Sequence, residues 1–434
     1  MTCIGIRRED KNEWERRVPL SPSAVAKLTG EGLAVCIQPS DIRAFSAEEY
    51  TAVGASVQED LSICPIVFGV KEMPVDFLEQ GKTYAYFSHT IKGQVYNMPM
   101  LQRLLDLKCQ LLDYELVAEE TGRRLLIFGR YAGLAGMIDA LWALGKRLAW
   151  EGVASPFADV RRAFEYASLS EAKESIQQIG ARITRDGLPA QVQPLVIGFA
   201  GYGNVSLGAQ EILDLLPHTT VEPCRIGEVA AASKAPSEPI LKVVFREEDM
   251  VEPVSPETRF ELQDYYDHPE KYRSRFESYL PHIHVLVNGI YWEPRYPRLV
   301  TKDWLRSAWA TGSRPRLKLI ADIGCDIEGP IQCTVKATDP GNPVYVYDPV
   351  NESVTDGWDG PGVVVLAVDN LPCELPRDAS EFFGGLLLPY VSRLARADYT
   401  APFGKLDLPA ELQRAFIVHQ GTLTPAHTHL KEYL

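Results

Sequence analysis

The chain lacks every sequence feature that would direct it to a nucleic acid or into a membrane. Its formal net charge is −14, and no block rich in Lys and Arg interrupts the acidic balance, so nucleic-acid binding is not expected. No stretch approaches the roughly 18 consecutive apolar residues of a membrane span. The first residues, MTCIGIRRED, have neither the apolar centre of a signal peptide nor the acid-poor composition of a transit segment. A cytoplasmic location is therefore expected.

Patterns typical of metal sites and disulfide frameworks are missing as well. The eight cysteines include no CxxC pair, and in a chain of this size we expect them to be buried free thiols. His282 and His284, like His427 and His429, have HxH spacing, but no third ligand lies nearby in the sequence. No metal site is therefore predicted.

What the sequence does contain is the pattern of a globular α/β protein. Hydrophobic residues make up 46% of the 434 residues, enough for the cores of two or three domains. In the first part, Ser21-Pro22 is predicted to begin a helix that ends at Gly30, and Ser46 with Glu49 to form a capping box. Strands are predicted at 2–6, 33–37, 65–70, 83–88 and 125–128.

A second α/β unit is predicted after a long helix over 131–150, whose glycines suit close helix packing. Its strands are expected at 195–200, 285–291, 317–323 and 363–368. The polar stretch from about 225 to 280 is interpreted as an insertion without long elements. Residues 379–434 are expected to be largely helical, with breaks at Pro389, Pro402 and Pro409.

The most specific local motif is a dinucleotide-binding loop in LVIGFAGYGNVSLGAQ, residues 195–210. An apolar strand leads into Gly201-x-Gly203-x-x-Ser206, and a helical pattern follows. Gly201 permits a tight turn, Gly203 allows the backbone to approach a pyrophosphate, and the third position needs a small residue. The loop and first helical residues, which include Asn204 and Val205, would bind the phosphates through free N–H groups.

The nature of the dinucleotide stays open between NAD(H) and NADP(H). Glu222 lies 21 residues after Gly201, where an acidic residue would bind a ribose 2′-OH and favour NAD. Arg225, three residues further on, could instead accept the 2′-phosphate of NADP.

Lys71 and His89 are the candidate catalytic residues, because each directly follows a predicted strand. Ligands of open parallel sheets bind at the carboxyl ends of the strands, so neighbouring strands would bring the two side chains into one crevice. Both are proton carriers whose pKa values respond to burial and to neighbouring charges. Glu72, Lys92 and Glu115 are expected to supply mixed charge around them.

Arginines in loops of the same domain are candidates for binding substrate carboxylates or phosphates. Arg16 and Arg17 precede the first predicted helix, and Arg123 and Arg124 follow a turn. The guanidinium group is the natural bidentate partner of such anions.

The amino-acid sequences of several segments, which are spread over nearly the whole chain, resemble those of one enzyme family. The segments are IGIRREDKNEWERRVPLSP (4–22), FGVKEMP (68–74), YAYFSHTIKG (84–93), LLDYE (111–115), FGRYAGLAGMID (128–139), GYGNVSLGAQ (201–210), VNGIYWEPRYPRL (287–299), LIADIGCDIEGPIQ (319–332) and VDNLPCELPRDASEFFGGLLLPYV (368–391). They resemble the lysine–ketoglutarate reductase part of aminoadipic semialdehyde synthase. The last also resembles fungal lysine-forming saccharopine dehydrogenase and, more distantly, alanine dehydrogenase.

The resemblance implies an α/β fold of two Rossmann-like domains with parallel sheets and a cleft between them. The catalytic domain would comprise residues 1–135 and 376–434, and the dinucleotide-binding domain residues 136–375. It also implies the reversible reaction of L-lysine, 2-oxoglutarate and NAD(P)H to saccharopine, with no metal. A homo-oligomer and a separate saccharopine-cleaving dehydrogenase are compatible with it.

The resemblance also assigns roles to individual residues. Lys71 and His89 match the family's acid–base pair, and Glu72 and Glu115 match carboxylates that adjust this pair. Arg17 matches a ligand of the substrate carboxylate. The remaining matches are Arg124 and Phe128 near the cofactor, and Asp322 and Asp369 in segments that line the cleft.

Two alternatives stay open from the sequence. An opine-type dehydrogenase would share the fold and the imine reduction but condense a different amine and keto acid. A catalytically silent dinucleotide-binding protein would be expected to have lost Lys71, His89 or Arg17, yet all three are present. The second dehydrogenase of the fused animal and plant enzymes is expected to be absent from this chain.

Overall fold

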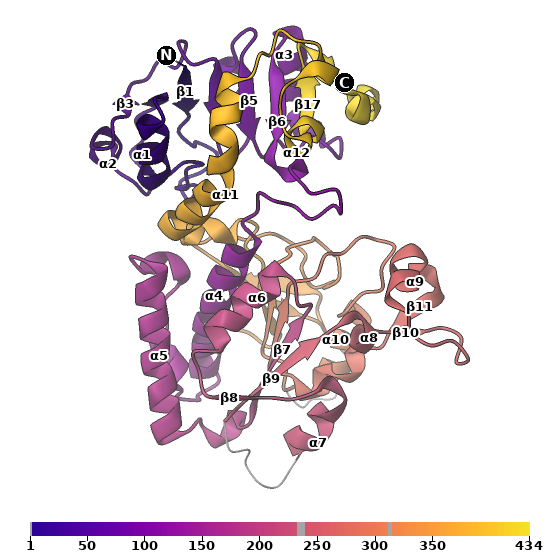
Figure 1. Ribbon diagram of the computed structural model, residues 1–434. Helices are drawn as coiled ribbons and strands as arrows, with labels where there is room; N and C mark the ends of the chain where they lie inside the picture. The colour runs from indigo at the N-terminus through magenta and orange to yellow at the C-terminus, as the bar shows by residue number, and fades with distance from the viewer. Residues whose placement is uncertain (1, 232–238, 311–314) are drawn as a thin grey trace. The chain divides into compact units, whose positions relative to one another are not determined.

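The structure is a computed structural model that describes residues 2–231, 239–310 and 315–434. The chain forms two compact units (Figure 1). The first comprises Met1–Phe128 and Pro376–Leu434, and the second comprises Gly129–Leu375. No helix in the described ranges is both long and apolar enough to cross a membrane.

The first unit is built on an eight-stranded sheet in the order β18-β17-β6-β5-β4-β1-β2-β3. The strands from β6 to β3 are parallel, and β17 and β18 extend the sheet antiparallel. Their bounds are β1 Cys3–Ile6, β2 Ala34–Ile37, β3 Ser56–Val57, β4 Ile66–Phe68, β5 Thr83–Tyr86, β6 Gln110–Asp113, β17 Phe416–His419 and β18 Thr422–Leu423. The helices are α1 Pro22–Gly30, α2 Ala47–Thr51, α3 Met98–Asp106, α11 Pro376–Arg396 and α12 Ala410–Arg414.

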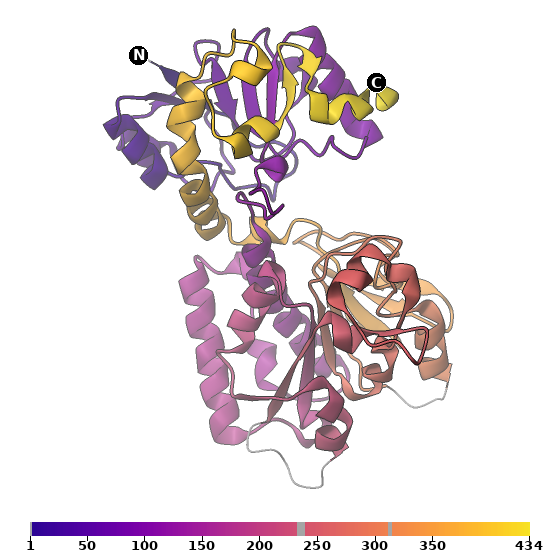
Figure 2. The ribbon, with the colours of Figure 1, turned by 45° about the vertical axis from the view of Figure 1, so that its right-hand side comes forward.

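The C-terminal segment completes this unit, so that the ends of the sequence share one sheet. In Figure 2 the yellow segment packs against the indigo-to-purple strands of the same unit. Helix α11 contributes Phe383, Leu387 and Val391 to the core that also contains Ile4 and Tyr84. Both segments of this discontinuous unit therefore contribute side chains to one hydrophobic core.

The second unit contains another eight-stranded sheet, ordered β15-β14-β16-β13-β12-β7-β9-β8. Its strands are β7 Leu195–Ala200, β8 His218–Thr220, β9 Ile240–Phe245, β12 Val285–Asn288, β13 Leu319–Asp322, β14 Val344–Asp348, β15 Ser353–Asp356 and β16 Val363–Leu366. All neighbours from β8 to β16 are parallel, whereas β14 and β15 are antiparallel. A small antiparallel pair joins β10 Val251–Pro253 to β11 Tyr272–Ser274.

Helices flank this second sheet, with α4, α5 and α6 together on one side of it (Figure 1). The helices are α4 Gly129–Trp150, α5 Leu169–Asp186, α6 Asn204–Leu213, α7 Ile226–Ala231, α8 Glu247–Met250, α9 Leu262–Asp267 and α10 Lys302–Ala310. All six residues of β7 are buried. Such uninterrupted apolar strands are typical of parallel sheets covered on both faces, and the predicted α/β fold class is confirmed.

Helices α4 and α6 approach so closely that their contact points have to be glycines. A Cβ atom on Gly133 would lie 1.9 Å from the carbonyl oxygen of Val205, and one on Gly208 would lie 2.1 Å from that of Arg130. The interpretation of the glycines in 131–150 as close-packing residues is therefore confirmed. This contact also fixes the beginning of α6, which follows the glycine-rich loop.

Several predictions about elements are wrong. Residues 125–128 form no strand, and the pairing just before them is the isolated bridge between Ala118 and Arg124. The domain boundary expected after residue 135 stays a prediction: this residue lies inside α4, and the first compact unit ends at Phe128. The stretch 225–280 is not simply an insertion, because β9 lies within it and pairs with β7 in the main sheet. Part of that stretch, 232–238, lies outside the described residues.

The C-terminal region also differs from the prediction. Helix α11 continues through Pro389. Proline has no N–H to donate to the carbonyl of Gly385, four residues earlier, but Gly385 is exposed to solvent. Beyond α12, β17 and β18 extend the first sheet instead of continuing a helical region. Strands β6, β14 and β15 have no counterpart in the sequence prediction.

Candidate active site

Lys71 and His89 follow two neighbouring parallel strands of the first unit. Lys71 follows β4 and His89 follows β5, and the two strands pair directly. The pairing continues beyond the strands, because the N–H of Phe87 donates to the carbonyl of Val70 at 3.1 Å. Both side chains therefore extend from the same edge of the sheet.

Glu72 connects these two loops through His89. Its Oε1 lies 2.6 Å from Nδ1 of His89, and its other oxygen lies 3.2 Å from the ammonium of Lys11. Burial alone would raise the pKa of Glu72, but the hydrogen bond and charge of His89 outweigh it and lower that pKa to about 2. Glu72 is therefore an anion at neutral pH that orients the imidazole through this hydrogen bond.

The backbone around His89 is held in an uncommon conformation. His89 has a φ of 48°, a left-handed value that costs energy for a residue other than glycine. Ser88 donates its hydroxyl to Asp113, and the Asn97 amide donates to the carbonyls of Ser88 and His89, each at 3.1 Å. These bonds from β6 and from the start of α3 determine where the imidazole points.

The Lys71 side chain is mostly buried, with charges of both signs nearby. Burial lowers its pKa from the ordinary lysine value, and the nearby charge of Arg17 lowers it further. No carboxylate in the described ranges lies within ion-pair distance of its ammonium. The neutral amine is therefore accessible at a lower pH than for an exposed lysine.

Glu9, in the loop after β1, fixes the backbone that carries Lys71. Its carboxylate oxygens accept the N–H groups of Val70 at 2.7 Å and Lys71 at 3.0 Å. Burial and the charge of Glu15 raise the pKa of Glu9 to about 7. Glu9 was not among the residues predicted from the sequence, although its position in a charged run after a strand was a usable signal.

Arg17 is buried and bound to Glu15. Its Nε and Nη2 donate to the two carboxylate oxygens of Glu15 at 2.8 and 2.6 Å. Its guanidinium also stacks over the ring of Phe128 at 4.3 Å, and Phe128 in turn stacks on Phe383 at 4.5 Å. Arg17 thus lies near Lys71, with its orientation fixed by a carboxylate and two aromatic rings.

The other predicted residues of this unit lie around the pair in different ways. Glu115 forms an ion pair with Arg124 at 2.6 Å, so Arg124 is its direct partner. Lys92 is exposed, and its backbone N–H donates to the Gln94 side chain. The structure therefore brings Glu72 to the acid–base pair and binds Glu115 to an arginine.

The glycine-rich loop of the second unit has the geometry of a dinucleotide site. Gly201 has a φ of 90°, which requires glycine, and Gly203 is the N-cap of α6. No atom lies within 4 Å of a Cβ position on Gly203, and no side chain caps the N–H groups of Asn204 and Val205. The backbone here is open to a pyrophosphate, and Ser206 is buried as the small third residue.

Two cavities adjoin this loop within the second unit. One, of about 350 Å³, is lined by Gly201 and Tyr202, and by tyrosines 265, 266, 291 and 296. The other, of about 520 Å³, also contains Tyr202, together with Glu222 and Arg246. The loop, the free helix N-terminus and the cavities on either side of Tyr202 fit an adenine dinucleotide.

The strand order places Arg246 at the position that the sequence spacing predicted for Glu222. In the usual dinucleotide fold, the strand next to the loop strand ends with the residue that contacts the ribose 2′ position. Here that neighbour of β7 is β9, which ends before Arg246, whereas β8, before Glu222, lies one strand further out. The Arg246 guanidinium lies 5.1 Å from the ring centre of Tyr202 in the glycine loop.

The other predicted residues of the second unit have three different environments. Arg225 is exposed and lies 3.6 Å from Glu228. Asp322 is fully buried and accepts hydrogen bonds from Asn288 and Thr334, while burial raises its pKa to about 6. Asp369 follows β16 and is exposed.

Comparison with known proteins assigns the family. The N-terminal domain model of alanine dehydrogenase/PNT matches residues 5–135, and the corresponding C-terminal domain model matches residues 267–426. The chain belongs to the alanine dehydrogenase/PNT family. The C-terminal model covers most of the second sheet, which is the nicotinamide-dinucleotide-binding part of this family.

Within the family, the chain is homologous to two groups of curated enzymes. It is 39% identical to alpha-aminoadipic semialdehyde synthase of Arabidopsis thaliana, over 98% of this chain and 41% of that protein. The mitochondrial enzyme of Bos taurus is 35% identical, over 99% and 47%. The chain therefore spans less than half the length of these relatives. Saccharopine dehydrogenase [NAD(+), L-lysine-forming] of Emericella nidulans is 27% identical, over 90% of this chain and 92% of its own.

Solved structures share the fold at lower sequence identity. L-alanine dehydrogenase matches with a TM-score of 0.61 and 19% identity, and covers the whole of both chains. The transhydrogenase from Sinorhizobium meliloti matches with a TM-score of 0.57 and 16% identity, over 97% of this chain and all of that one. These similarities agree with two mainly parallel α/β units.

Proposed function

We propose that this chain catalyses the reversible reductive condensation of L-lysine with 2-oxoglutarate to saccharopine, with a reduced nicotinamide dinucleotide as hydride donor. The observation that carries the proposal is the grouping of Lys71, His89 and Glu72 at the ends of β4 and β5. The homology to lysine-forming saccharopine dehydrogenases over nearly the whole chain supports the choice of substrates.

The proton transfers of this reaction match the two catalytic candidates. The lysine ε-ammonium has to lose a proton before its nitrogen attacks the keto carbon, and Lys71, with its lowered pKa, is the base that accepts it. The resulting carbinolamine has to lose water, and His89, oriented by Glu72, donates the proton with which the hydroxyl group leaves as water. The bound dinucleotide supplies the hydride that reduces the imine.

Positive charge near this pair suits the carboxylates of 2-oxoglutarate. The Arg17 guanidinium and the Lys11 ammonium both act on the pKa of Lys71 through their charges. Arg17 is buried, and a buried guanidinium attracts a carboxylate more strongly than an exposed one does. We assign Arg17 to the substrate carboxylate, in an orientation that Glu15 determines.

We assign the cofactor as NADP(H), bound by Arg246 through the 2′-phosphate. Arg246 follows the strand adjacent to the glycine-loop strand, and Glu222 follows the outer one. Both line the same cavity. Asp249 also lines this cavity. Its carboxylate accepts the backbone N–H of Arg246 at 3.0 Å and therefore points to the start of its own helix.

The first experiment measures oxidation of reduced dinucleotide, by absorbance, with lysine and 2-oxoglutarate supplied together or singly. We expect turnover only with both substrates, and a fall in kcat of at least about a hundredfold in both Lys71→Met and His89→Gln. Lys405→Met, which changes an exposed lysine of the same unit, should retain the wild-type rate.

Two other outcomes would change the assignment. Turnover with a different amine or keto acid, and none with lysine, would replace the reaction with that of an opine-type dehydrogenase. Full activity in Lys71→Met and His89→Gln would remove these residues from the chemistry.

A second experiment tests the cofactor assignment by comparing two arginines. Arg246→Ala should raise the KM for NADPH by about ten- to a hundredfold, the value of one or two charge-assisted hydrogen bonds, with little change for NADH. Arg225→Ala is the matched control and should leave both values unchanged. A raised KM for NADPH in Arg225→Ala but not in Arg246→Ala would assign the 2′-phosphate to Arg225. A preference of the wild type for NADH would assign the ribose 2′-OH to Glu222.

A further inference from the structure

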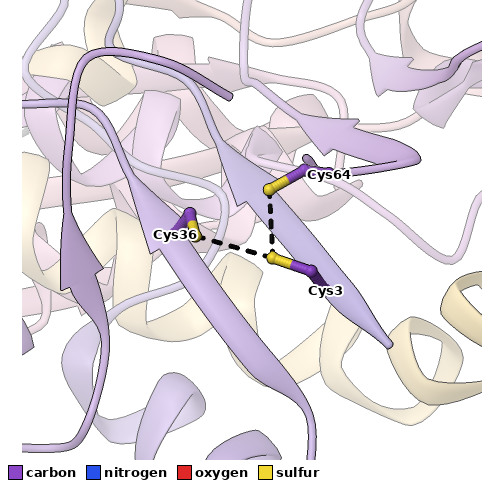
Figure 3. A group of neighbouring side chains, drawn as sticks. All are labelled: Cys3, Cys36 and Cys64. Carbon is purple, nitrogen blue, oxygen red and sulfur yellow. Dashed lines mark hydrogen bonds between the residues drawn. The ribbon is translucent and has the colours of Figure 1, made fainter. Parts of the chain in front are cut away.

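Three cysteines that are distant in the sequence converge in the first unit, away from the catalytic loops. The sulfur of Cys3 lies 3.5 Å from that of Cys36 and 3.1 Å from that of Cys64 (Figure 3). All three sulfurs lie within 4.8 Å of one another. Sequence spacing cannot identify such a group, because its members come from three different segments.

The sheet brings these thiols together on one face. Cys3 begins β1, and Cys36 lies on the adjacent strand β2, opposite Gly5. Cys64 precedes β4, on the other side of β1. A Cβ atom on Gly5 would lie only 3.2 Å from the Cβ of Cys64, so the glycine leaves the room that Cys64 occupies.

The three members of the group differ in burial. Cys36 is 4% exposed and Cys64 is 0% exposed, whereas Cys3 is only half-buried.

The geometry points to a binding site for a soft, thiophilic metal ion with three-fold sulfur coordination, the class that includes Cu(I) and Cd²⁺. An ion bonded to three thiolates lies about 2.3 Å from each sulfur. A triangle with two sides of 3.1 and 3.5 Å and a third no longer than 4.8 Å has its centre at roughly this distance. In the described ranges, no fourth His, Cys, Asp or Glu ligand joins the group, which disfavours tetrahedral Zn²⁺.

Binding exchanges thiol protons for the ion. Each thiol that ligates releases one proton to solvent and keeps its electron pair for the metal–sulfur bond, so no oxidant or reductant is needed. Because the ion replaces protons on the sulfurs, the apparent affinity should fall as the pH falls.

The test titrates the reduced full-length chain with Cd²⁺ and follows the ultraviolet sulfur-to-metal charge-transfer band. We expect one tight site per chain in the wild type and in Cys224→Ala, which removes an exposed thiol outside the group. Cys3→Ala and Cys36→Ala should each lose the tight site. Cys3→Ala is the safer variant for folding, because its side chain is only half-buried.

X-ray absorption of the Cu(I)-loaded chain provides a second measurement. Three sulfur neighbours at a single distance in the wild type, and fewer in Cys3→Ala, would support the site. The proposal is overturned if Cd²⁺ binding survives in Cys3→Ala and Cys36→Ala, if Cys224→Ala abolishes it, or if Cu(I) has fewer than three sulfur neighbours. None of these results depends on the dehydrogenase activity.

Discussion

At the scale of single residues, the candidate site depends on carboxylates that support the catalytic groups. Glu72 orients His89, and Glu9 accepts the backbone N–H groups of Val70 and Lys71. Glu9 is buried, and its pKa is raised to about 7 by burial and by the charge of Glu15. A carboxyl group with this pKa titrates in the range in which the enzyme would work.

Replacing Glu9 by Gln should change the pH dependence of stability. Because the folded pKa is raised, Glu9 binds its proton more tightly in the folded state. Its stabilising contribution is complete below about pH 4.5 and is lost as the pH rises through about 7. Gln cannot ionise, so the Gln variant should not lose this stability as the pH rises. Between pH 4.5 and 8, its free energy of unfolding should therefore increase relative to that of the wild type by on the order of 3 kcal/mol.

Urea unfolding at several pH values measures this difference. The lost hydrogen bond of the Gln variant gives an offset that does not depend on pH, so only the slope matters. If the free energy of unfolding changed equally with pH in the two proteins, this would contradict the raised pKa of Glu9.

The buried pair of Arg17 and Glu15 gives a second prediction at this scale. Arg17→Met should lower the free energy of unfolding by about 3–5 kcal/mol, because it leaves the Glu15 carboxylate, which is 0% exposed, without this partner. Adding Glu15→Gln should recover part of the loss, since the buried charge is then removed. Chemical denaturation of both variants measures this, and a double variant less stable than Arg17→Met would contradict it.

At the scale of elements, the contact between α4 and α6 positions the glycine-rich loop. The two helices meet at Gly133 and Gly208, where any Cβ atom would overlap a backbone carbonyl. Since α6 begins directly after Gly203, a shift of this helix also moves the N–H groups assigned to the pyrophosphate.

Gly133→Ala should therefore weaken both folding and cofactor binding. We expect a loss of stability of about 1–3 kcal/mol from overpacking, together with a higher Kd for NADPH. The matched control is Gly385→Ala in α11, where a Cβ meets nothing within 4 Å, and which should gain about 0.5–1 kcal/mol. Thermal unfolding and calorimetric titration measure both, and equal stability of the two variants would refute the packing argument.

At the scale of the whole molecule, the two units have separate cores. One core joins residues of β1–β6 to α11, and another surrounds β7, β9 and β12. The glycine-rich loop and its two cavities belong to the second unit. We therefore expect the chain to unfold in two steps that respond differently to the cofactor.

Scanning calorimetry should show two transitions, of which NADPH raises only one. A concentration a hundredfold above Kd adds about 2.7 kcal/mol, which corresponds to a rise in Tm of about 5–10 °C for a unit of this size. The rise should shrink in Arg246→Ala. A single transition, or an equal rise of both, would show that the units do not unfold independently.

Local patterns in the sequence were sufficient for much of the fold and for the main candidates. The apolar run before Gly201, the glycine spacing and the helix after it predict a dinucleotide loop, because each feature depends on neighbours in the chain. Lys71 and His89 could be chosen because each directly follows a predicted strand, and the ends of parallel strands share one edge.

Only the tertiary structure decided which of these residues meet. The pairing of Glu72 with His89, the pairing of Glu115 with Arg124, and the support from Glu9 depend on contacts across strands. The placement of β9 beside β7, which favours Arg246 over Glu222, and the convergence of the three thiols depend on strand order. Strand order arises from contacts between distant segments, so a reading of one sequence by local pattern does not determine it.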